Sequence, residues 1–490
     1  MLKLTSMMSV VLVALLMLSG ISLATEAAEA DPMDRIRLEM GTTAEYGGGS
    51  YVAVNMTEGT SLAWFAVVYG NEDDPSPITI VGANIRYLGG ANVVSQDGTV
   101  LLDQVPIPVI TVFGQSLFSL LEFDDVGYRT DFGLDYGAGN GLFDFNSDRR
   151  LFDDSNGRFE PVYKYISLER AWQLSEIETT IDAANQSKHY DFSVYAEDVL
   201  YTTVWDSELM SYRNGTADDG VVERIEFAFH VTATATESVV QIPFYEVTVG
   251  EDDRDGVIRD SEQIASRNFT GVTTDTQFKY DHIIEGWDPA ADAEDPRIML
   301  ENGIIHAVFI PEVVENWYSG QFVQDEVEDG SGVAEFETEN VTVEVRDTSE
   351  APEKATVVTR DEISFRDNWQ RTGALTWVSN VSVDGQEELV IYQVHAGSRH
   401  LLPEEVPDEH VRSIVLLGGY IYPVGESVMH DPAVDFAAIA VDMDPSIPVL
   451  VTVIIAIVAV VCLVLVAAVV ALLYVQRKKR GRMQVPPPYR

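Results

Sequence analysis

Hydrophobic and polar residues alternate along most of the chain between residues 31 and 440. The clearest stretch places one set of apolar side chains on a single face: Ile225, Phe227, Phe229, Val231, Ala233 and Ala235. A period of two predicts β-strands with one buried face. The same alternation predicts strands over residues 51–56, 64–69, 191–205, 239–249, 276–284, 303–310, 333–345, 355–365, 374–383 and 388–396.

Short turns separate these stretches. Asp-Gly pairs mark four of them, at Asp97-Gly98, Asp219-Gly220, Asp329-Gly330 and Asp384-Gly385. Many short strands with Gly and Asp turns are typical of antiparallel sandwiches. The sequence therefore predicts a mainly β chain with two to three antiparallel, β-sandwich-like extracellular domains.

One segment in this region has a helical pattern instead. Between Ser167 and about Ala184, apolar residues recur at near-helical spacing, and Ser167 can cap the first turn. The apolar positions are Leu168, Trp172, Ile177 and Ile181. We expect one helix here.

The two ends of the chain carry targeting patterns. Residues 1–30 combine Lys3, an apolar run from Met7 to Leu18 and small residues, which predicts a cleaved signal peptide. Residues 449–475 contain no charged side chain and are long enough to cross a bilayer as a helix. The basic tail over residues 476–490 predicts a cytoplasmic C-terminus and an extracellular N-terminal region at the plasma membrane.

Soft boundaries divide the region between these ends. Polar or Gly- and Asp-rich stretches predict β-rich extracellular domains over residues 31–157 and 158–347, the second with the helix, and a membrane-proximal β-rich domain over residues 348–440. The only cysteine is Cys462, inside the predicted membrane helix. A single cysteine excludes an intramolecular disulfide framework.

The charge balance narrows the class of protein. The chain has 79 acidic and 31 basic residues and a formal net charge of −48. No Asp or Glu follows Asp444, so the acidity is spread over the predicted external region. Such a surface excludes a nucleic-acid partner. It indicates adaptation to a saline exterior, as at an archaeal cell surface, and a cation-collecting surface at ordinary salt is the alternative.

Six acceptor motifs for N-glycosylation also indicate an exterior location. They are spread over the whole predicted external region, at Asn55, Asn185, Asn214, Asn268, Asn340 and Asn380.

The sharpest motif for a ligand is an acidic stretch over residues 251–262. Read as a twelve-position calcium loop, it has oxygen donors at positions 1, 3, 5 and 12, a carbonyl donor at position 7 and Gly256 at the turn. The donors are Glu251, Asp253, Asp255, Val257 and Glu262. Position 1 is Glu rather than Asp, and the flanks are not helical, so a solvated acidic hairpin is the alternative.

A second calcium candidate begins D-x-N-x-D, with Asp144, Asn146 and Asp148, but no glycine follows. Four histidines of the last domain, His395, His400, His410 and His430, match no compact zinc pattern. No nucleophile-elbow or H-E-x-x-H motif is present, so no motif points to an enzyme. Calcium is thus the single cofactor that the sequence suggests.

An uncharged segment over residues 105–121 stands out in so acidic a chain. Exposed, it would form an apolar patch able to enter a membrane. Buried, it would form core strands, which is the ordinary placement of such residues.

Three functions are compatible with these patterns. The first is a single-pass cell-surface glycoprotein with a structural or interaction (envelope or adhesion) role and protein or glycan partners. The second is a membrane-active spike that uses residues 105–121. The third is a surface-anchored hydrolase whose carboxylates are hidden among the other acidic residues.

Overall fold

The computed structural model describes most of the region between the two predicted membrane-targeting ends. The described residues are 32–42, 49–58, 61–95, 97–124, 128–129, 135–136, 143, 162–206, 208, 211–249, 258–291, 293–309, 356–359, 362–367, 370–395 and 411–441. They are mainly β-strands that pair antiparallel, which confirms the predicted class. The predicted signal segment and residues 449–475 lie outside this part of the chain. Within it, no helix is long and apolar enough to span a membrane.

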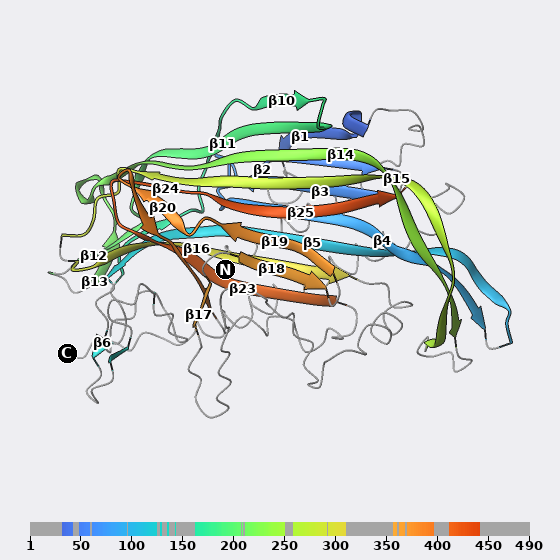
Figure 1. Cartoon of the computed structure of the whole chain (residues 1–490). Coiled ribbons are helices and arrows are strands. Elements are labelled where there is room, and N and C mark those ends of the chain that lie inside the picture. The colour runs from blue at the N-terminus through green and yellow to red at the C-terminus, as the bar shows by residue number, and fades with distance from the viewer. Residues whose placement is uncertain are drawn as a thin grey trace.

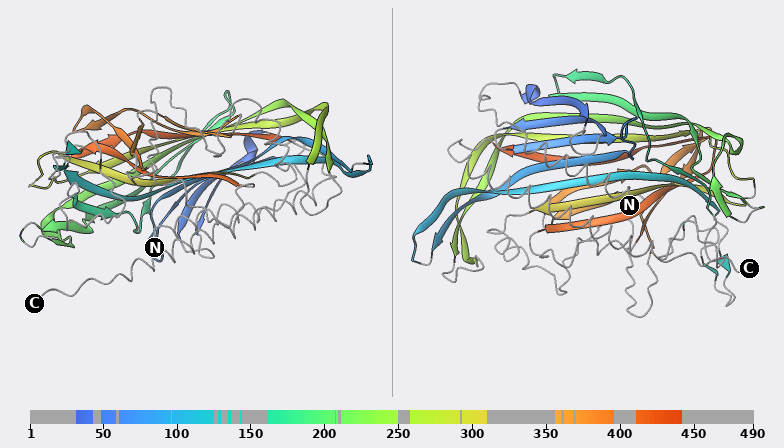
Figure 2. Two further views of the ribbon diagram at one scale, coloured as in Figure 1. Left: turned by 90° about the horizontal axis from the view of Figure 1, so that it is seen from below. Right: turned by 180° about the vertical axis from the view of Figure 1, so that it is seen from behind.

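The strands stack in two layers (Figure 2, left). The first layer follows one continuous ladder from its edge strand: β1 (Ile36–Thr42), β2 (Ser50–Glu58), β3 (Ser61–Tyr69), β4 (Thr79–Ser95), β5 (Val100–Asp124), β16 (Pro296–Phe309), β23 (Val411–Pro423), β22 (Ile391–His395) and β17 (Thr356–Thr359). Beside the end of β5 this layer continues with β8 (Val162–Ser167), β12 (Thr203–Asp206) and β13 (Ser211–Asn214).

The second layer is built around the longest strands. Its main ladder is β10 (Glu178–Asp182), β11 (Ser187–Leu200), β14 (Val221–Val249), β15 (Ile258–Glu285), β25 (Pro432–Val441), β19 (Gln370–Trp377) and β18 (Glu362–Asp367). Shorter strands extend it: β9 (Gln173–Leu174) on β11, and β24 (Ser427–His430), β20 (Asn380–Val383) and β21 (Gln386–Leu389) beyond β15.

Few described elements lie outside the two ladders. They are β6 (Tyr128–Arg129) with β7 (Asp135–Tyr136), and the short 3-10 helices η1 (Pro32–Arg35) and η2 (Ala217–Asp219). Strands from all three predicted domain ranges share the first layer, since β16 pairs with both β5 and β23.

Aromatic side chains fill the space between the layers. Phe65 on β3 packs against Phe278 on β15 with ring centroids 3.9 Å apart, and Trp377 on β19 packs against Tyr392 on β22. The alternation from Ile225 to Ala235 is confirmed, because all six apolar side chains of that stretch are buried. Their burial stabilises the fold, because each Å² of apolar surface removed from water contributes about 25 cal/mol.

Three strands are much longer than the short strands that the sequence predicts. β14 has 29 residues, β15 has 28 and β5 has 25. The ends of β4–β5 and β14–β15 run together beyond the other strands (Figure 1), where residues 90–95 pair in parallel with residues 244–249. Register shifts interrupt the β14–β15 ladder after Phe244 and Thr248, and Val239 is exposed nearby on β14, but ladder hydrogen bonds keep the chain extended.

The predicted helix over Ser167 to Ala184 is wrong. The segment contains β9 and β10, and the hydroxyl of Ser167 accepts a hydrogen bond from the Glu169 amide in a turn. The apolar residues advance by four, five and four positions, which does not hold one helical face, and Ile181 is exposed. Its β-branched run Thr179-Thr180-Ile181 instead pairs with β11.

The second half of the uncharged segment 105–121 lies in the core. From Val112 to Leu121 every side chain is buried, including the polar Gln115, Ser116 and Ser119. These residues form the central part of β5, between β4 and β16. The core interpretation is confirmed for this half, and the side chains of residues 105–111 lie outside the described ones.

Candidate functional site

The predicted calcium residues fall mostly outside the described part of the chain. This applies to Glu251, Asp253, Asp255, Val257, Asp144, Asn146 and Asp148. Glu262 is described and lies within β15 opposite Glu246, while the β14–β15 ladder extends to the pair Val249 and Ile258. Glu262 is therefore roughly 13 Å along the strand from Ile258. Among the described residues no three His, Cys, Asp or Glu side chains could hold a metal ion.

Five of the six predicted glycosylation acceptors lie among the described residues. Asn185, Asn214, Asn268 and Asn380 are exposed. Asn55 is half-buried on β2, and its side-chain oxygen is buried without a hydrogen-bond partner. Asn340 lies outside the described residues. Four acceptors are thus accessible to a modifying enzyme, from strands and turns of both layers.

A buried carboxyl group marks one end of the two layers. Glu122 on β5 is fully buried, and its two oxygens accept hydrogen bonds from the Trp287 indole (2.8 Å) and the Ala290 amide (2.7 Å). Burial raises the pKa of Glu122, against these two hydrogen bonds and the charge of Lys164, which lower it. Two residues further on, Asp124 accepts hydrogen bonds from the amides of Glu294 and Asp295. The end of β5 thus anchors the segment that leads from β15 to β16.

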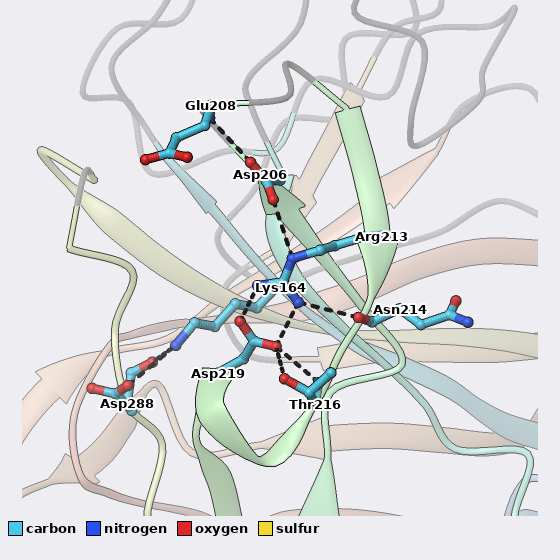
Figure 3. A network of polar contacts seen from close by, with 8 residues as sticks. All are labelled: Lys164, Asp206, Glu208, Arg213, Asn214, Thr216, Asp219 and Asp288. Atoms are coloured by element: carbon cyan, nitrogen blue, oxygen red, sulfur yellow. Dashed lines mark hydrogen bonds and ion pairs between the residues drawn. The ribbon is translucent and has the colours of Figure 1, made fainter.

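Lys164 completes this anchor (Figure 3). Its ammonium group donates to the main-chain oxygen of Asp288 and lies 3.5 Å from an Asp288 carboxylate oxygen. The same ammonium group sits 4.6 Å from the centre of the Tyr201 ring, and burial raises the pKa of Tyr201. The ring of Tyr201 packs edge-on against Trp287. We refer to Glu122, Lys164, Tyr201, Trp287 and Asp288 as the carboxyl anchor.

A second network lies beside the anchor, over β12, β13 and η2 (Figure 3). The Arg213 guanidinium binds both oxygens of Asp219, one at 2.7 Å, and one oxygen of Asp206 at 3.3 Å. Hydrogen bonds from Arg213 hold the pKa of Asp219 well below its usual value. Asp219 also accepts from the amide and hydroxyl of Thr216, which closes the turn before β14. Bidentate pairing of this kind fixes geometry.

A third polar cluster lies in the core, and its contacts from β15 and β24 to β5 and β23 join the two layers. Tyr280 on β15 donates to Gln115 on β5 (2.5 Å), and Tyr392 on β22 donates to Asn302 on β16 (2.7 Å). Next to them, the Tyr422 hydroxyl on β23 contacts ring nitrogens of both His282 and His430. Sequence reasoning singled out only His430, as one scattered histidine. The one signal in the chain is the mirrored order Asp281-His282 and His430-Asp431.

These clusters use their charges to hold segments together. The carboxyl anchor fixes the β15–β16 connection, and Arg213 fixes the turn before β14. Glu122 has the raised pKa of a general acid, but both of its oxygens are engaged and its side chain is fully buried. The arrangement holds the β15–β16 connection and the turn before β14 in place.

No protein-family model matches the chain, and no curated protein or solved structure is significantly similar to it.

Proposed function

We propose that this chain is a single-pass cell-surface glycoprotein with a structural or interaction role. The observation that carries the proposal is the exposure of four predicted glycan acceptors, Asn185, Asn214, Asn268 and Asn380, on both layers of a β-rich region. The finer predictions belong to the same proposal: two to three sandwich-like domains, a cleaved signal peptide, a membrane helix over residues 449–475 and a cytoplasmic tail. Its partners would be proteins or glycans at the cell surface.

The anchored turns support a structural role. The buried Glu122 and the partly exposed Arg213 fix the connections at one end of the two layers. Such fixed connections give a stiff module that holds its outer surface in place. Calcium at residues 251–262 or 144–148 would add to that stiffness, and this stays a prediction.

The location is tested by digesting intact cells with a protease that cannot enter them. Epitope tags are placed at the C-terminus and, in a separate strain, after residue 31. We expect the N-terminal tag to be lost and the C-terminal tag to be protected within a short membrane-bound fragment. Protection of both tags in intact cells, with loss after lysis, would contradict a surface location.

The saline exterior is tested by transferring the purified chain to low salt. The Debye length grows from about 10 Å at 0.1 M to about 30 Å at 0.01 M, so repulsion within the acidic surface increases. We expect strand circular dichroism to be lost at low salt and to be kept when divalent cations are added. An unfolding midpoint that does not depend on salt would favour the alternative, a cation-collecting surface on a protein that works at ordinary salt.

A further inference from the structure

Two histidines face each other in the core, at the point where β24 pairs with β15. His282 and His430 are directly opposite in the antiparallel ladder, and each is about 1% exposed. Their rings lie 5.7 Å apart between centroids. Tyr422, from β23 of the other layer, is fully buried beside both of them.

Three contacts connect these rings in a chain. His282 Nδ1 lies 2.7 Å from the Tyr422 hydroxyl, and that hydroxyl lies 3.2 Å from His430 Nδ1. His430 Nε2 lies 3.0 Å from the main-chain oxygen of Val378. We refer to His282, Tyr422, His430 and the Val378 carbonyl as the histidine chain. It links β15 and β24 of the second layer to β23 of the first.

The chemistry of each group gives the chain one direction. A carbonyl oxygen only accepts, so His430 Nε2 must carry the proton that is donated to Val378. Nδ1 of a neutral His430 is then an acceptor, and Tyr422 donates its single proton to it. The Tyr422 oxygen in turn accepts from the Nδ1 proton of His282. The reverse direction requires a doubly protonated His430 in the core.

This direction leaves one lone pair without a partner. His282 Nε2 is buried and has no hydrogen-bond partner. The titratable groups that face the two rings are Tyr280 on β15 and Tyr420 and Tyr422 on β23, and burial raises the pKa of each. Asp431, next to His430, acts on that ring from a position where it is paired with Lys279. No described carboxylate contacts His282.

We propose that the histidine chain is an acid-sensitive lock between the two layers, closed while both imidazoles are neutral and opened when they take up protons. The first proton from solvent goes to His282 Nε2, where an N–H bond forms on the free lone pair. The imidazolium that results has no counterion and lies beside a second histidine. Proton uptake therefore favours separation of β23 from β15 and β24, which lets water reach the rings.

The direction of the pH effect follows from burial. Burial lowers the pKa of His282, with a further contribution from His430, and it lowers the pKa of His430 to about 4. An exposed histidine titrates at about 6.5. The lock is thus fully closed above pH 6.5, and its stabilisation is lost as the pH falls from 6.5 towards 4.

The first test measures unfolding of the full-length chain between pH 7.5 and 4.5 at constant high salt. Each histidine should raise the unfolding equilibrium constant by about tenfold per pH unit well below 6.5. His282→Gln should therefore weaken the pH dependence by about one tenfold step per unit. His189→Gln, at a half-buried ring on β11, is the matched control and should change the pH dependence by less. An unchanged pH dependence in folded His282→Gln would overturn the proposal.

The second test needs no substitution and remains decisive if that variant does not fold. His282 is in the only Asp-His dipeptide of the chain, and His430 is in the only Met-His dipeptide. Selective ¹³C-carbonyl and ¹⁵N-histidine labelling therefore assigns both rings by solid-state NMR of the full-length chain. We expect the Nδ1–H tautomer at His282 and the Nε2–H tautomer at His430 at pH 7.5. The opposite tautomers, or an imidazolium in the folded chain at pH 5.5, would overturn the lock.

Discussion

The carboxyl anchor and the histidine chain are two polar clusters in the core. They provide hydrogen-bond partners for buried polar groups in different ways. At the anchor, a carboxyl group receives two fixed donors and lies near an ammonium group, which offset part of the burial that raises its pKa. In the histidine chain, every group is neutral, and one proton after another is donated in a single direction. Fixed hydrogen bonds hold the carboxyl group of the anchor, whereas neutrality makes the histidine chain sensitive to protons.

The largest loss of stability is expected when the carboxyl group of Glu122 is removed from the anchor. Glu122→Ala leaves the Trp287 indole and the Ala290 amide without acceptors, while Lys164 keeps its contact with Asp288. We expect a loss of about 3 kcal/mol in the free energy of unfolding, measured by denaturant titration. Glu178→Ala on the exposed strand β10 is the control, with a change within about 0.5 kcal/mol. Equal effects of the two variants would show that the anchor does not stabilise the fold.

A smaller loss is expected from breaking the neutral chain at its centre. Tyr422→Phe keeps the aromatic ring but removes the hydroxyl that both histidines contact. We expect a loss of about 2 kcal/mol at pH 7.5, because two buried ring nitrogens lose their partner. Tyr195→Phe, half-buried under Arg224, is the matched control. A loss below about 0.5 kcal/mol for Tyr422→Phe would mean that the layers are held without this chain.

The smallest expected effect is a gain in stability. It comes from Asp281, which neighbours His282 on β15 and lies on the other face of the β15–β24 ladder. Burial and the charge of Asp431 raise the pKa of Asp281. A carboxyl group whose pKa is raised by folding costs stability while it is ionised, and this cost disappears as the pH falls. We expect Asp281→Asn to gain about 0.5–1 kcal/mol at pH 7.5 and progressively less toward pH 4.

The control for that variant is Asp191→Asn. Asp191 contacts the same His230 ring as Asp281, at 2.6 Å from Nδ1. Because this substitution removes a hydrogen-bonded carboxylate, no gain in thermal midpoint is expected. A gain of equal size in both variants would indicate general relief of acidic repulsion instead of a property of the Asp281–Asp431 pair.

The sequence predicts the local features of this fold because they depend on neighbouring residues. Alternation predicted the buried face from Ile225 to Ala235 and most of the strands. The same local reasoning failed between Ser167 and Ala184, where pairing with β11 decides the conformation. It also expected short strands, since it could not foresee that β14 and β15 would support each other over their whole length.

The clusters themselves could not be predicted from local patterns. Glu122 and Trp287 are 165 positions apart, and His282 and Tyr422 are 140 apart. Such pairs meet only because β5, β15 and β23 become neighbours in the folded chain. In a sequence with 79 acidic residues, nothing distinguishes Glu122 from an exposed carboxylate. The acidic calcium motifs stay predictions, because most of their residues lie outside the described part of the chain.

The surface location is the central claim, and site-resolved mapping of N-glycans on the chain from its own cells tests it most directly. We predict occupancy at Asn185, Asn214, Asn268 and Asn380, whose side chains are exposed, and an unmodified Asn55, which is half-buried on β2. Peptides from the same digest give both results in one measurement. Four unmodified acceptors, or a glycan found at Asn55 while the exposed acceptors are bare, would contradict the account.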